Sequence, residues 1–426
     1  MAIPSTTAFS VVEGTGGHDT LVSTSSMGYY DCAIIGGGPA GLATAIAISK
    51  SSPSSSVAVF ERDGFQPKGA SIQISKTGWG SIENLDPSLV DKLKKTGVPV
   101  TSVEFKPMSV AECDDSNKGI KDIKGVMSRF VFKAVSFFTR VLPAAITYVH
   151  LWHDVRSVLA DHAKEVYSFA TNSKEEESFD DLIELHCSLE SIRPLSNSPN
   201  NELEDGARFE LTFENQENRV RAKYVFACDG TNSRVRTLLP NEPDVLLSEN
   251  KSVWRGVAPN VQSFGKAIFY TGANDGRSAL VFPGGKDAGS SWTVIGDAIP
   301  GRSRTSEEAR GRLLAVTSDC DDILKRAIGD SPVIIENKLQ IRDFELPWES
   351  SYDGLVYIGD AAHPVRPTGE GTALAFEDAK VLGDMIGKHG LCVEALRSYE
   401  DARYEPVKKI SEEVRAIAQS SYSRST

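Results

Sequence analysis

Residues 34–42 read Ile-Ile-Gly-Gly-Gly-Pro-Ala-Gly-Leu, and this stretch decides the fold. An apolar run at 30–35 precedes the glycines and is typical of a buried parallel strand. Small and aliphatic residues at helical spacing follow over 39–50, and a second apolar run occupies 57–60. Strand, glycine turn, helix and strand together predict the βαβ unit that binds a dinucleotide.

The glycine turn supplies five predicted contacts to a dinucleotide, namely Gly36, Gly38, Pro39, Ala40 and Gly41. Its three fingerprint glycines allow a tight turn, close approach of the backbone to a pyrophosphate, and close packing of helix on strand. The phosphates would lie at the helix N-terminus, where free N–H groups and the helix dipole favour negative charge. Glu61 ends the second strand, where an acid accepts both ribose hydroxyls. The pattern therefore predicts the ADP half of FAD or NAD rather than NADP.

Two later segments indicate FAD. The first, residues 227–236, reads Ala-Cys-Asp-Gly-Thr-Asn-Ser-Arg-Val-Arg, and the second begins Gly359-Asp360-Ala361-Ala362-His363-Pro364. Asp360 closes an apolar run at 355–358 and can accept a hydrogen bond from a sugar-alcohol hydroxyl, here the ribityl chain. Residues 369–373 then open a helix whose N–H groups can face the pyrimidine edge of a flavin, which becomes anionic on reduction.

Bulk properties exclude several classes of function. The chain has 426 residues, enough for two or three domains, and a net charge of −12, which argues against nucleic-acid binding. Its six cysteines are scattered without a CxxC pair, as expected for reduced thiols in a cytoplasmic protein. The histidines lack the spacing of metal ligands, so we expect no metal site. Residues 1–28 are rich in Ser, Thr and Gly and are interpreted as a disordered extension.

The expected fold class is α/β, with a Rossmann-like FAD-binding domain, an interleaved antiparallel-sheet substrate domain and a C-terminal helix. Short apolar runs between Gly, Pro and Asn predict the antiparallel sheet, at 267–270, 279–282, 291–295 and 333–335. Polar residues over 170–205 predict loops or a hairpin tip. The expected division is a discontinuous FAD-binding domain (29–105, 150–245 and 350–390), an insertion (106–149), a substrate domain (246–349) and a C-terminal helix (391–426).

The insertion contains an unusual segment at 118–141. On a helix, five of its charged residues fall within about 60° of one another, and the remaining surface is mostly apolar; they are Lys118, Asp122, Arg129, Lys133 and Arg140. Two interpretations stay open: a lid packed over the active-site mouth, or a basic amphipathic helix that makes peripheral contact with a membrane.

The chain resembles the single-component (class A) FAD-dependent monooxygenases, which include p-hydroxybenzoate hydroxylase, salicylate hydroxylase and zeaxanthin epoxidase. The resemblance covers roughly residues 30–415 and rests on 359–367, on Glu377-Asp378-Ala379 and on the Asp-Gly segment with Ser233 and Arg236. Residues 69–74 and Trp254-Arg255-Gly256 are similar to the salicylate hydroxylase and zeaxanthin epoxidase side of the group.

The resemblance implies that NAD(P)H docks transiently and reduces FAD, that O2 adds to the reduced flavin, and that a hydroperoxyflavin hydroxylates or epoxidises an aromatic or isoprenoid-like small molecule. It also implies further cofactor contacts at Arg62, Asp229, Gly359, Asp360, Pro367, Gly369, Gly371, Thr372 and Ala373. No invariant catalytic side chain carries over, and Arg366 and His363 are the candidates. Whether the chain is a monomer or a homodimer stays open.

Three positions depart from the family pattern. Glu370 and Ala373 stand where relatives usually have Gln and Asn, and an ionised Glu370 close to the flavin would disfavour its anionic reduced form unless it points to solvent. Trp152 stands where relatives have an Arg that contacts FAD, and Arg156 is the expected substitute. A reductase or halogenase on the same fold is an alternative, although the WxWxIP halogenase signature is absent. A non-catalytic flavin redox sensor is another.

Overall fold

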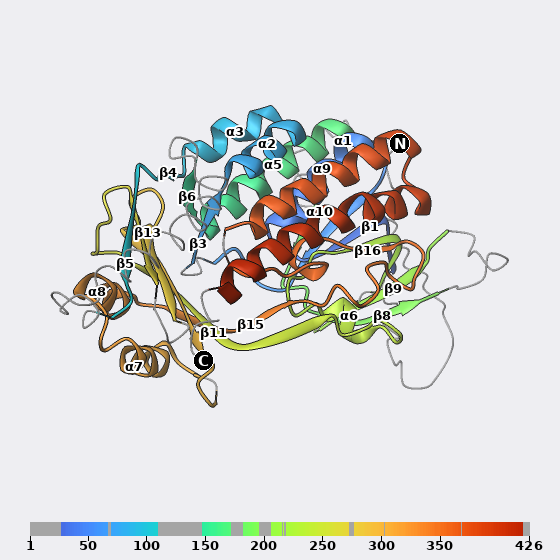
Figure 1. Ribbon diagram of the computed structural model, residues 1–426. Helices are drawn as coiled ribbons and strands as arrows, with labels where there is room; N and C mark the ends of the chain where they lie inside the picture. Colours follow the sequence, from blue (N-terminus) through green and yellow to red (C-terminus); the bar gives the residue numbers. More distant parts are fainter. Residues whose placement is uncertain are drawn as a thin grey trace, which may run out of the picture.

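The computed structural model describes residues 27–66, 70–109, 147–171, 182–195, 206–214, 216, 219–271, 277–301, 303–367 and 369–420. The expected extension as far as residue 26 and the whole segment 118–141 lie outside these residues. Figure 1 shows two main parts: a sheet with helices packed over it, and a second sheet carrying two helices of its own.

The larger sheet has seven strands in the order β7-β2-β1-β10-β9-β8, with β16 also paired to β10. Its strands are β1 (Met27–Ile35), β2 (Val57–Glu61), β7 (Ile183–Leu185), β8 (Leu189–Pro194), β9 (Phe209–Phe213), β10 (Arg219–Ala227) and β16 (Leu355–Tyr357). β7, β2, β1, β10 and β16 are parallel, whereas β9 and β8 extend the sheet as an antiparallel hairpin. The polar stretches at 172–181 and 196–205, where loops or a hairpin tip were expected, lie outside the described residues, and β7 and β8 are strands between them.

Six helices cover one face of this sheet (Figure 1). They are α1 (Pro39–Ser51), α2 (Lys76–Leu85), α3 (Pro87–Lys94), α5 (Trp152–Thr171), α9 (Gly371–His389) and α10 (Val393–Ser420). Alternate residues such as Ile34 and Phe226 face these helices, whereas Ile35 and Val225 belong to a second core on the opposite face. Because both faces are covered, the central strands are apolar along their length, which explains the continuous runs in the sequence.

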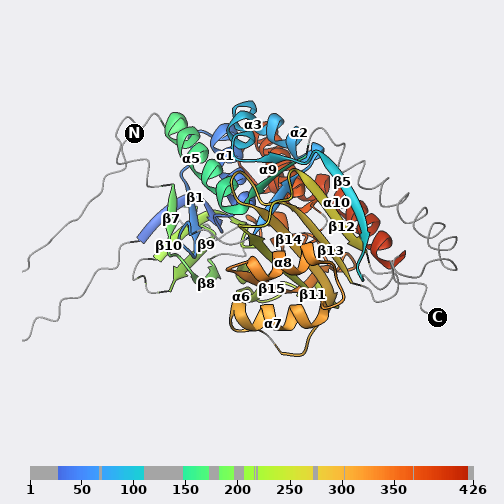
Figure 2. The ribbon, with the colours of Figure 1, turned by 90° about the vertical axis from the view of Figure 1, so that its left-hand side faces the viewer.

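The second sheet has six strands in the order β15-β11-β14-β13-β12-β5. They are β5 (Ser102–Pro107), β11 (Leu246–Ala258), β12 (Lys266–Thr271), β13 (Ser278–Pro283), β14 (Ser290–Asp297) and β15 (Ile334–Arg342). Two helices, α7 (Ser306–Val316) and α8 (Asp322–Asp330), cover one of its faces (Figures 1 and 2). β5 pairs in parallel with β12, so the expected boundary at residue 105 cuts through a strand of this sheet.

A third, small sheet joins the two parts. It contains β3 (Ser71–Ile74), β4 (Val98–Pro99) and β6 (Tyr148–Leu151). The Ser71 hydroxyl donates a hydrogen bond to the Gly284 carbonyl in the turn between β13 and β14 (2.7 Å). Gly285 in that turn has φ +119°, and a Cβ there would lie 2.7 Å from the Leu151 nitrogen, so the turn packs directly on β6. None of the described helices is long and apolar enough to cross a bilayer.

One buried carboxylate ties the C-terminal helices to the strand that carries the Gly-Asp segment. Asp378 of α9 accepts hydrogen bonds from the Gly359 N–H (2.9 Å), from His363 Nε2 (2.6 Å) and from Arg403 Nε of α10 (2.6 Å). Burial by itself would raise the pKa of Asp378, but the neighbouring His363 and Arg403 outweigh it and lower the pKa. The ionised carboxylate therefore fixes Gly359–Ala361, the one-turn 3-10 helix η3, against α9 and α10.

Replacing Asp378 by Ala is expected to lower the free energy of unfolding by about 3–5 kcal/mol. The buried Arg403 would lose its buried partner and keep the partly exposed Glu377 (2.8 Å), and the Gly359 N–H and His363 would lose their acceptor. Urea denaturation followed by circular dichroism measures this. Asp384→Ala is the control: this half-exposed carboxylate on the same helix pairs with Lys380, and its loss should cost less than about 1 kcal/mol. Equal losses from the two variants would show that Asp378 does not hold the loop.

Candidate functional site

The three sequence motifs meet at one edge of the larger sheet. The parallel register places Ile35 of β1 beside Phe60 of β2 and Ala227 of β10, and Ala227 beside Tyr357 of β16. Each of these residues is at or next to the carboxyl end of its strand, so the glycine turn, Glu61 and the two aspartate segments emerge side by side. Ligands of open α/β sheets bind at this edge, in the crevice outside the carboxyl ends of the strands.

A cavity of about 980 Å³ opens along this edge and continues beneath the second sheet. Its volume is at the upper end of the 300–1,000 Å³ that is usual for ligand pockets, which suits a cofactor together with a second molecule. Thirteen of the site residues predicted from the sequence line it: Gly36, Gly38, Pro39, Ala40, Glu61, Arg62, Asp229, Asp360, Arg366, Pro367, Gly369, Gly371 and Thr372.

The other five predicted residues lie behind the cavity wall. They are Gly41, Arg156, Gly359, His363 and Ala373. A Cβ at Gly41 would lie 1.9 Å from the Gly36 carbonyl oxygen, and Gly359 has φ +62° and packs on Ala40, so both glycines serve close packing. His363 is 1% exposed and faces Asp378, which gives it a structural position rather than access to a substrate.

The glycine turn leaves a helix end open to the cavity. Gly36 has φ +103°, and a Cβ there would lie 2.6 Å from the Cys228 carbonyl oxygen. Gly38, in contrast, has no atom within 4 Å of the Cβ position, so its free side faces the cavity. Among the described residues, no side chain caps α1, and its first turn contains no acid. The unpaired N–H groups of this turn can therefore bind an anion such as a pyrophosphate.

Arg156 supports the turn from behind. Its fully buried guanidinium donates from Nε to the Gly37 carbonyl (2.6 Å), lies 3.1 Å from a Glu61 carboxylate oxygen and stacks 3.9 Å from the Phe65 ring centre. Burial lowers the pKa of Arg156, and Glu61 opposes that shift. The same Glu61 oxygen accepts the Gly37 N–H (2.8 Å). Arg156 thus positions Glu61 and the turn, while Trp152 occupies the cavity wall in front of it.

Two aspartates present oxygens that suit hydroxyl donors. Asp229 uses Oδ2 to accept the Arg234 N–H (2.6 Å) and the Val235 N–H (3.0 Å), but its buried Oδ1 has no hydrogen-bond partner among the described residues. Asp360 is exposed to the cavity, and among the described residues its carboxylate accepts a long hydrogen bond from the Thr231 hydroxyl (3.4 Å). Burial raises the pKa of both carboxyls. A buried polar oxygen needs a partner, and a polyhydroxyl ligand supplies one.

Together, these hydrogen-bond donors and acceptors match the polar groups of FAD. The α1 N-terminus would hold the pyrophosphate, Glu61 the ribose and Asp360 the ribityl chain. α9 begins beside the cavity at Gly371 and Thr372, and its first turn contains no acid. That helix end would face the isoalloxazine ring, where it favours developing negative charge.

Glu370, which stands where relatives usually have Gln, does not point to solvent. The interpretation that placed its carboxylate in solvent is therefore wrong. The residue is 8% exposed and does not line the cavity. Burial, and to a smaller extent Glu377, raises the pKa of Glu370. The shift moves the carboxyl toward its neutral form, which lessens the conflict with an anionic flavin. Ala373, the second departure, is buried against Gly78 of α2.

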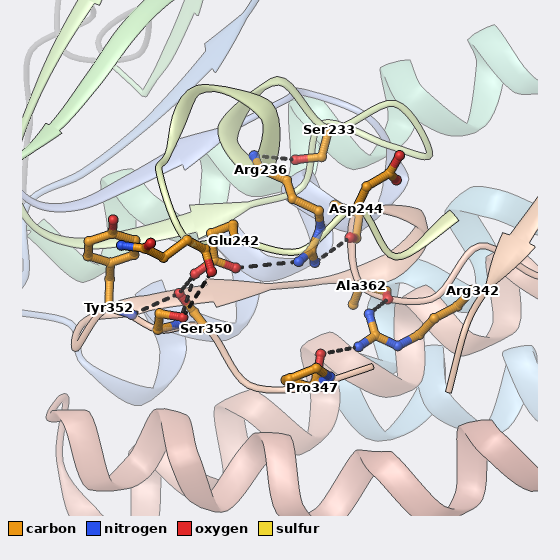
Figure 3. Close-up of polar contacts among 12 residues, drawn as sticks. Ser233, Arg236, Glu242, Asp244, Arg342, Pro347, Ser350, Tyr352 and Ala362 are labelled. Atoms are coloured by element: carbon orange, nitrogen blue, oxygen red, sulfur yellow. Dashed lines mark hydrogen bonds and ion pairs between the residues drawn. The ribbon is translucent and has the colours of Figure 1, made fainter. Parts of the chain in front are cut away.

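Two buried arginines fix the loop that follows β16 (Figure 3). Arg236, from the Asp-Gly segment, donates to the Ala361 carbonyl (3.1 Å) and pairs with the buried Glu242 (3.4 Å). Arg342, at the end of β15, donates to the Ala362 carbonyl (2.7 Å). The loop that presents Asp360 is thus held from both the first and the second part of the molecule. Arg342 belongs to no local motif, so its role was not predictable from the sequence.

The far wall of the cavity is the face of the second sheet that α7 and α8 leave uncovered. Alternating residues point into it, whereas Trp254 and Trp292 point to the helices. The apolar lining on this side consists of Phe105, Phe269, Leu280, Phe282, Ile295 and Ile335. Phe105 and Phe269 stack with ring centres 5.4 Å apart. The sequence predicted the sheet, but not which of its faces would meet the cofactor.

Arg255 is the main polar feature of this wall. It lies between Thr293 and Ile335 in the strand register, and all three line the cavity. Burial lowers the pKa of Arg255, and the charge of Asp360 opposes that shift. In the sequence, Arg255 stood out only as part of the motif that resembles the family, whereas the structure places it in the cavity wall, near Asp360.

Comparisons with known proteins support the assignment of this cavity as an FAD site. A family model described as FAD binding domain matches residues 193–413, just over half of the chain. The chain belongs to this FAD-binding family, the class A flavin monooxygenases. Salicyloyl-CoA 5-hydroxylase of Streptomyces sp is 27% identical over 210 residues, which cover 45% of this chain and 39% of that protein. FAD-dependent monooxygenase fsr3 of Gibberella fujikuroi is 25% identical over 226 residues, 46% and 42% of the two chains. The chain thus matches about two fifths of these relatives.

Solved structures share the fold over nearly the whole chain. HpxO of Klebsiella pneumoniae, complexed with FAD and uric acid, has a TM-score of 0.66 at 15% identity and covers 92% of this chain and 89% of its own. CtdE, in complex with FAD and its substrate 4, has a TM-score of 0.68 at 17% identity, covering 91% and 88%. At this level of identity, the likeness establishes the fold.

Two glycine variants distinguish a glycine that contacts the cofactor from one that the turn needs for its own packing. Gly38→Ala should change the stability of the FAD-free protein by no more than about 1 kcal/mol, yet weaken FAD binding at least about tenfold, because its methyl group would enter the space a pyrophosphate needs. Gly41→Ala should destabilise the FAD-free protein itself. Flavin fluorescence titration and thermal unfolding measure the two effects. Unchanged FAD affinity in Gly38→Ala would contradict the assigned phosphate position.

Proposed function

We propose that the chain is an FAD-dependent monooxygenase that uses NAD(P)H and O2 to hydroxylate or epoxidise an aromatic or isoprenoid-like small molecule. The observation that carries this proposal is one continuous cavity, in which the groups suited to bind FAD lie next to an aromatic wall. The balanced reaction takes substrate, O2, NAD(P)H and one proton to the oxygenated product, NAD(P)⁺ and water. One oxygen atom enters the product and the other leaves as water.

When bound, FAD supplies the redox chemistry that joins the nicotinamide donor to dioxygen. The chain supplies binding, orientation and exclusion of water. The α1 N-terminus and Glu61 would fix the ADP end, and the loop held by Arg236 and Arg342 would fix the flavin end. Phe105, Phe269 and their apolar neighbours would pack on the substrate and keep water out, while Thr293 and Asn337 offer polar groups for orienting it.

The named relatives favour oxygenation over the alternatives. Salicyloyl-CoA 5-hydroxylase and FAD-dependent monooxygenase fsr3 are both named as oxygenating enzymes. HpxO is structurally similar and has been crystallised with uric acid, a planar heterocycle. A flavin reductase or a redox sensor would use the same cofactor site, but neither needs an extended apolar wall next to it.

Isotope labelling tests the proposal directly. The FAD-loaded chain should be bleached by NAD(P)H, faster when a suitable aromatic or isoprenoid compound is present, and should transfer one atom of ¹⁸O from ¹⁸O2 into the product, as measured by mass spectrometry. Bleaching with reoxidation in air but no labelled product would favour the reductase. Failure of NAD(P)H to bleach the flavin under any condition would favour the sensor.

We also propose a cytoplasmic location with peripheral membrane contact through 118–141, on the basis of its sequence pattern. The full chain should float with vesicles that contain anionic lipid, and a deletion of 118–141 should not. Equal flotation of the two proteins, or flotation of neither, would contradict this contact.

A further inference from the structure

Phe264 is exposed and has an unfavourable backbone conformation. It precedes Gly265 in the turn between β11 and β12 and is 89% exposed. Phe264 has φ +51° and Gly265 has φ +77°, and the Lys266 N–H donates to the Ser263 carbonyl (2.9 Å). Two positive φ values inside such a hydrogen bond are typical of a type I′ turn, whose first central position favours Asn, Asp or Gly. Neither packing nor turn preference therefore accounts for a phenylalanine here.

Hydrogen bonds hold this turn against the residues that precede β5. The Gly265 carbonyl accepts from the Thr101 N–H (2.8 Å) and from the Thr101 hydroxyl (3.2 Å). A Cβ at Gly265 would lie 2.7 Å from that hydroxyl oxygen, so the turn requires glycine after Phe264. Strained residues persist where the surrounding structure holds them, and they are frequent at functional positions. The exposed ring of Phe264 is therefore carried by a well-defined backbone.

Three exposed lysines lie around this turn. Lys94 is the last residue of α3, and Lys95 follows it. Lys286 is in the turn between β13 and β14, and its N–H donates to the Thr96 carbonyl (3.3 Å). β12 and β13 are antiparallel neighbours, so the turn with Phe264 and the turn with Lys286 emerge at the same end of the second sheet.

Lysines outnumber acids at this end of the sheet, although the net charge of the chain is −12. Residues 91–103, 259–266 and 284–289 contain five lysines and two acids. Two of these lysines pair with acids outside the three stretches. Within the part of the chain that the structure describes, the three lysines named above pair with no acid. An exposed aromatic ring next to such lysines suits the surface of a membrane that contains anionic lipid.

The insertion rejoins the described chain at this same surface. Thr147 is the first described residue after it, and its carbonyl accepts the Val100 N–H (2.9 Å). In the sequence, 118–141 contains six basic residues and one acid. The chain therefore returns from the segment proposed to contact a membrane beside the strand residues that hold the Phe264 turn.

This end of the sheet also borders the apolar part of the cavity. Phe282 lines the cavity one residue before β13 ends. In the turn that follows, the Gly284 carbonyl accepts the hydrogen bond of Ser71, which lines the cavity as well. An apolar molecule dissolved in a bilayer at Phe264 would thus be close to the proposed substrate site.

From these observations we infer that Phe264, together with Lys94, Lys95 and Lys286, docks the folded chain on a membrane that contains anionic lipid. The inference rests on the proposed function in taking a membrane as the partner of 118–141, and it assigns a second contact to residues of the folded part. The ring of Phe264 enters the boundary between headgroups and acyl chains, and the lysines attract the anionic headgroups.

Vesicle binding by a Phe264 variant tests this inference. Phe264→Asn introduces a residue that the turn favours, so the midpoint of thermal unfolding should not fall. Its affinity for vesicles of phosphatidylcholine and phosphatidylserine should nevertheless weaken at least about fivefold, because the aromatic surface is lost. Co-sedimentation of the full-length FAD-loaded chain with increasing amounts of vesicles measures the affinity.

Phe169→Asn is the matched control. Phe169 is 88% exposed near the end of α5, and Figure 2 shows α5 and β5 on opposite sides of the molecule. Its replacement removes the same aromatic surface from another part of the protein and should change the affinity for vesicles by less than about twofold.

Lysine variants test the role of charge. Lys95→Gln combined with Lys286→Gln should weaken binding to the same vesicles at least about tenfold, since each lysine near an anionic surface contributes to the attraction. Lys338→Gln combined with Lys388→Gln changes the net charge equally, at exposed positions on β15 and α9. This control should change the affinity by less than about threefold.

Three results would overturn the inference. They are no vesicle binding by the wild type, equal affinities of Phe264→Asn and Phe169→Asn, and equal affinities of the two lysine double variants. The deletion of 118–141 separates the two membrane contacts. If the deletion binds like the wild type while Phe264→Asn binds more weakly, the contact through 118–141 fails and the Phe264 surface stands. Vesicle binding requires no turnover, so a failure to insert oxygen is a separate result.

Discussion

The site depends on the parallel pairing of four strands that come from three distant parts of the chain. β1 and β2 come from the first fifty residues of the described chain, β10 from its middle and β16 from near its end, and each pair is hydrogen-bonded in a fixed register. Parallel pairing brings all their carboxyl ends to one edge, so a phosphate turn, a ribose acid and two aspartates reach the same cavity. A slip of register by one residue would reverse the faces of a whole strand and separate these groups.

Buried charges then hold the loops at that edge in place. Arg156 supports the glycine turn, Arg236 and Arg342 hold the carbonyls after β16, and Asp378 fixes the same loop from α9. None of these four side chains lines the cavity. They act through backbone groups, and each also satisfies a polar atom that burial would otherwise leave unpaired. The residues that would contact FAD can therefore be small, and many are glycine.

Much of the cofactor site was predictable from the sequence because it is made of local signals. Glycine spacing, a strand-ending acid and a Gly-Asp segment are each set by a few neighbouring residues, and the strands at 30–35 and 57–60 are continuous apolar runs. Arg342 and the cavity face of the second sheet were not predictable, because each depends on contacts between residues that are far apart in the chain. α7 was missed for a different reason: it buries only Ala309 and Leu313, too few for a clear amphipathic pattern.

The central claim is that one ligand extends along the strand ends, from the α1 N-terminus to the α9 N-terminus, so that its two halves bind together. Isothermal titration of the FAD-free chain with FAD, FMN and ADP tests this claim most directly. FAD joins an FMN half and an ADP half in one molecule. Once one half is bound, binding of the other half is intramolecular, which raises the overall affinity. The account predicts that FAD binds at least about a hundredfold more tightly than either FMN or ADP. FAD binding no tighter than that of the better fragment would contradict it.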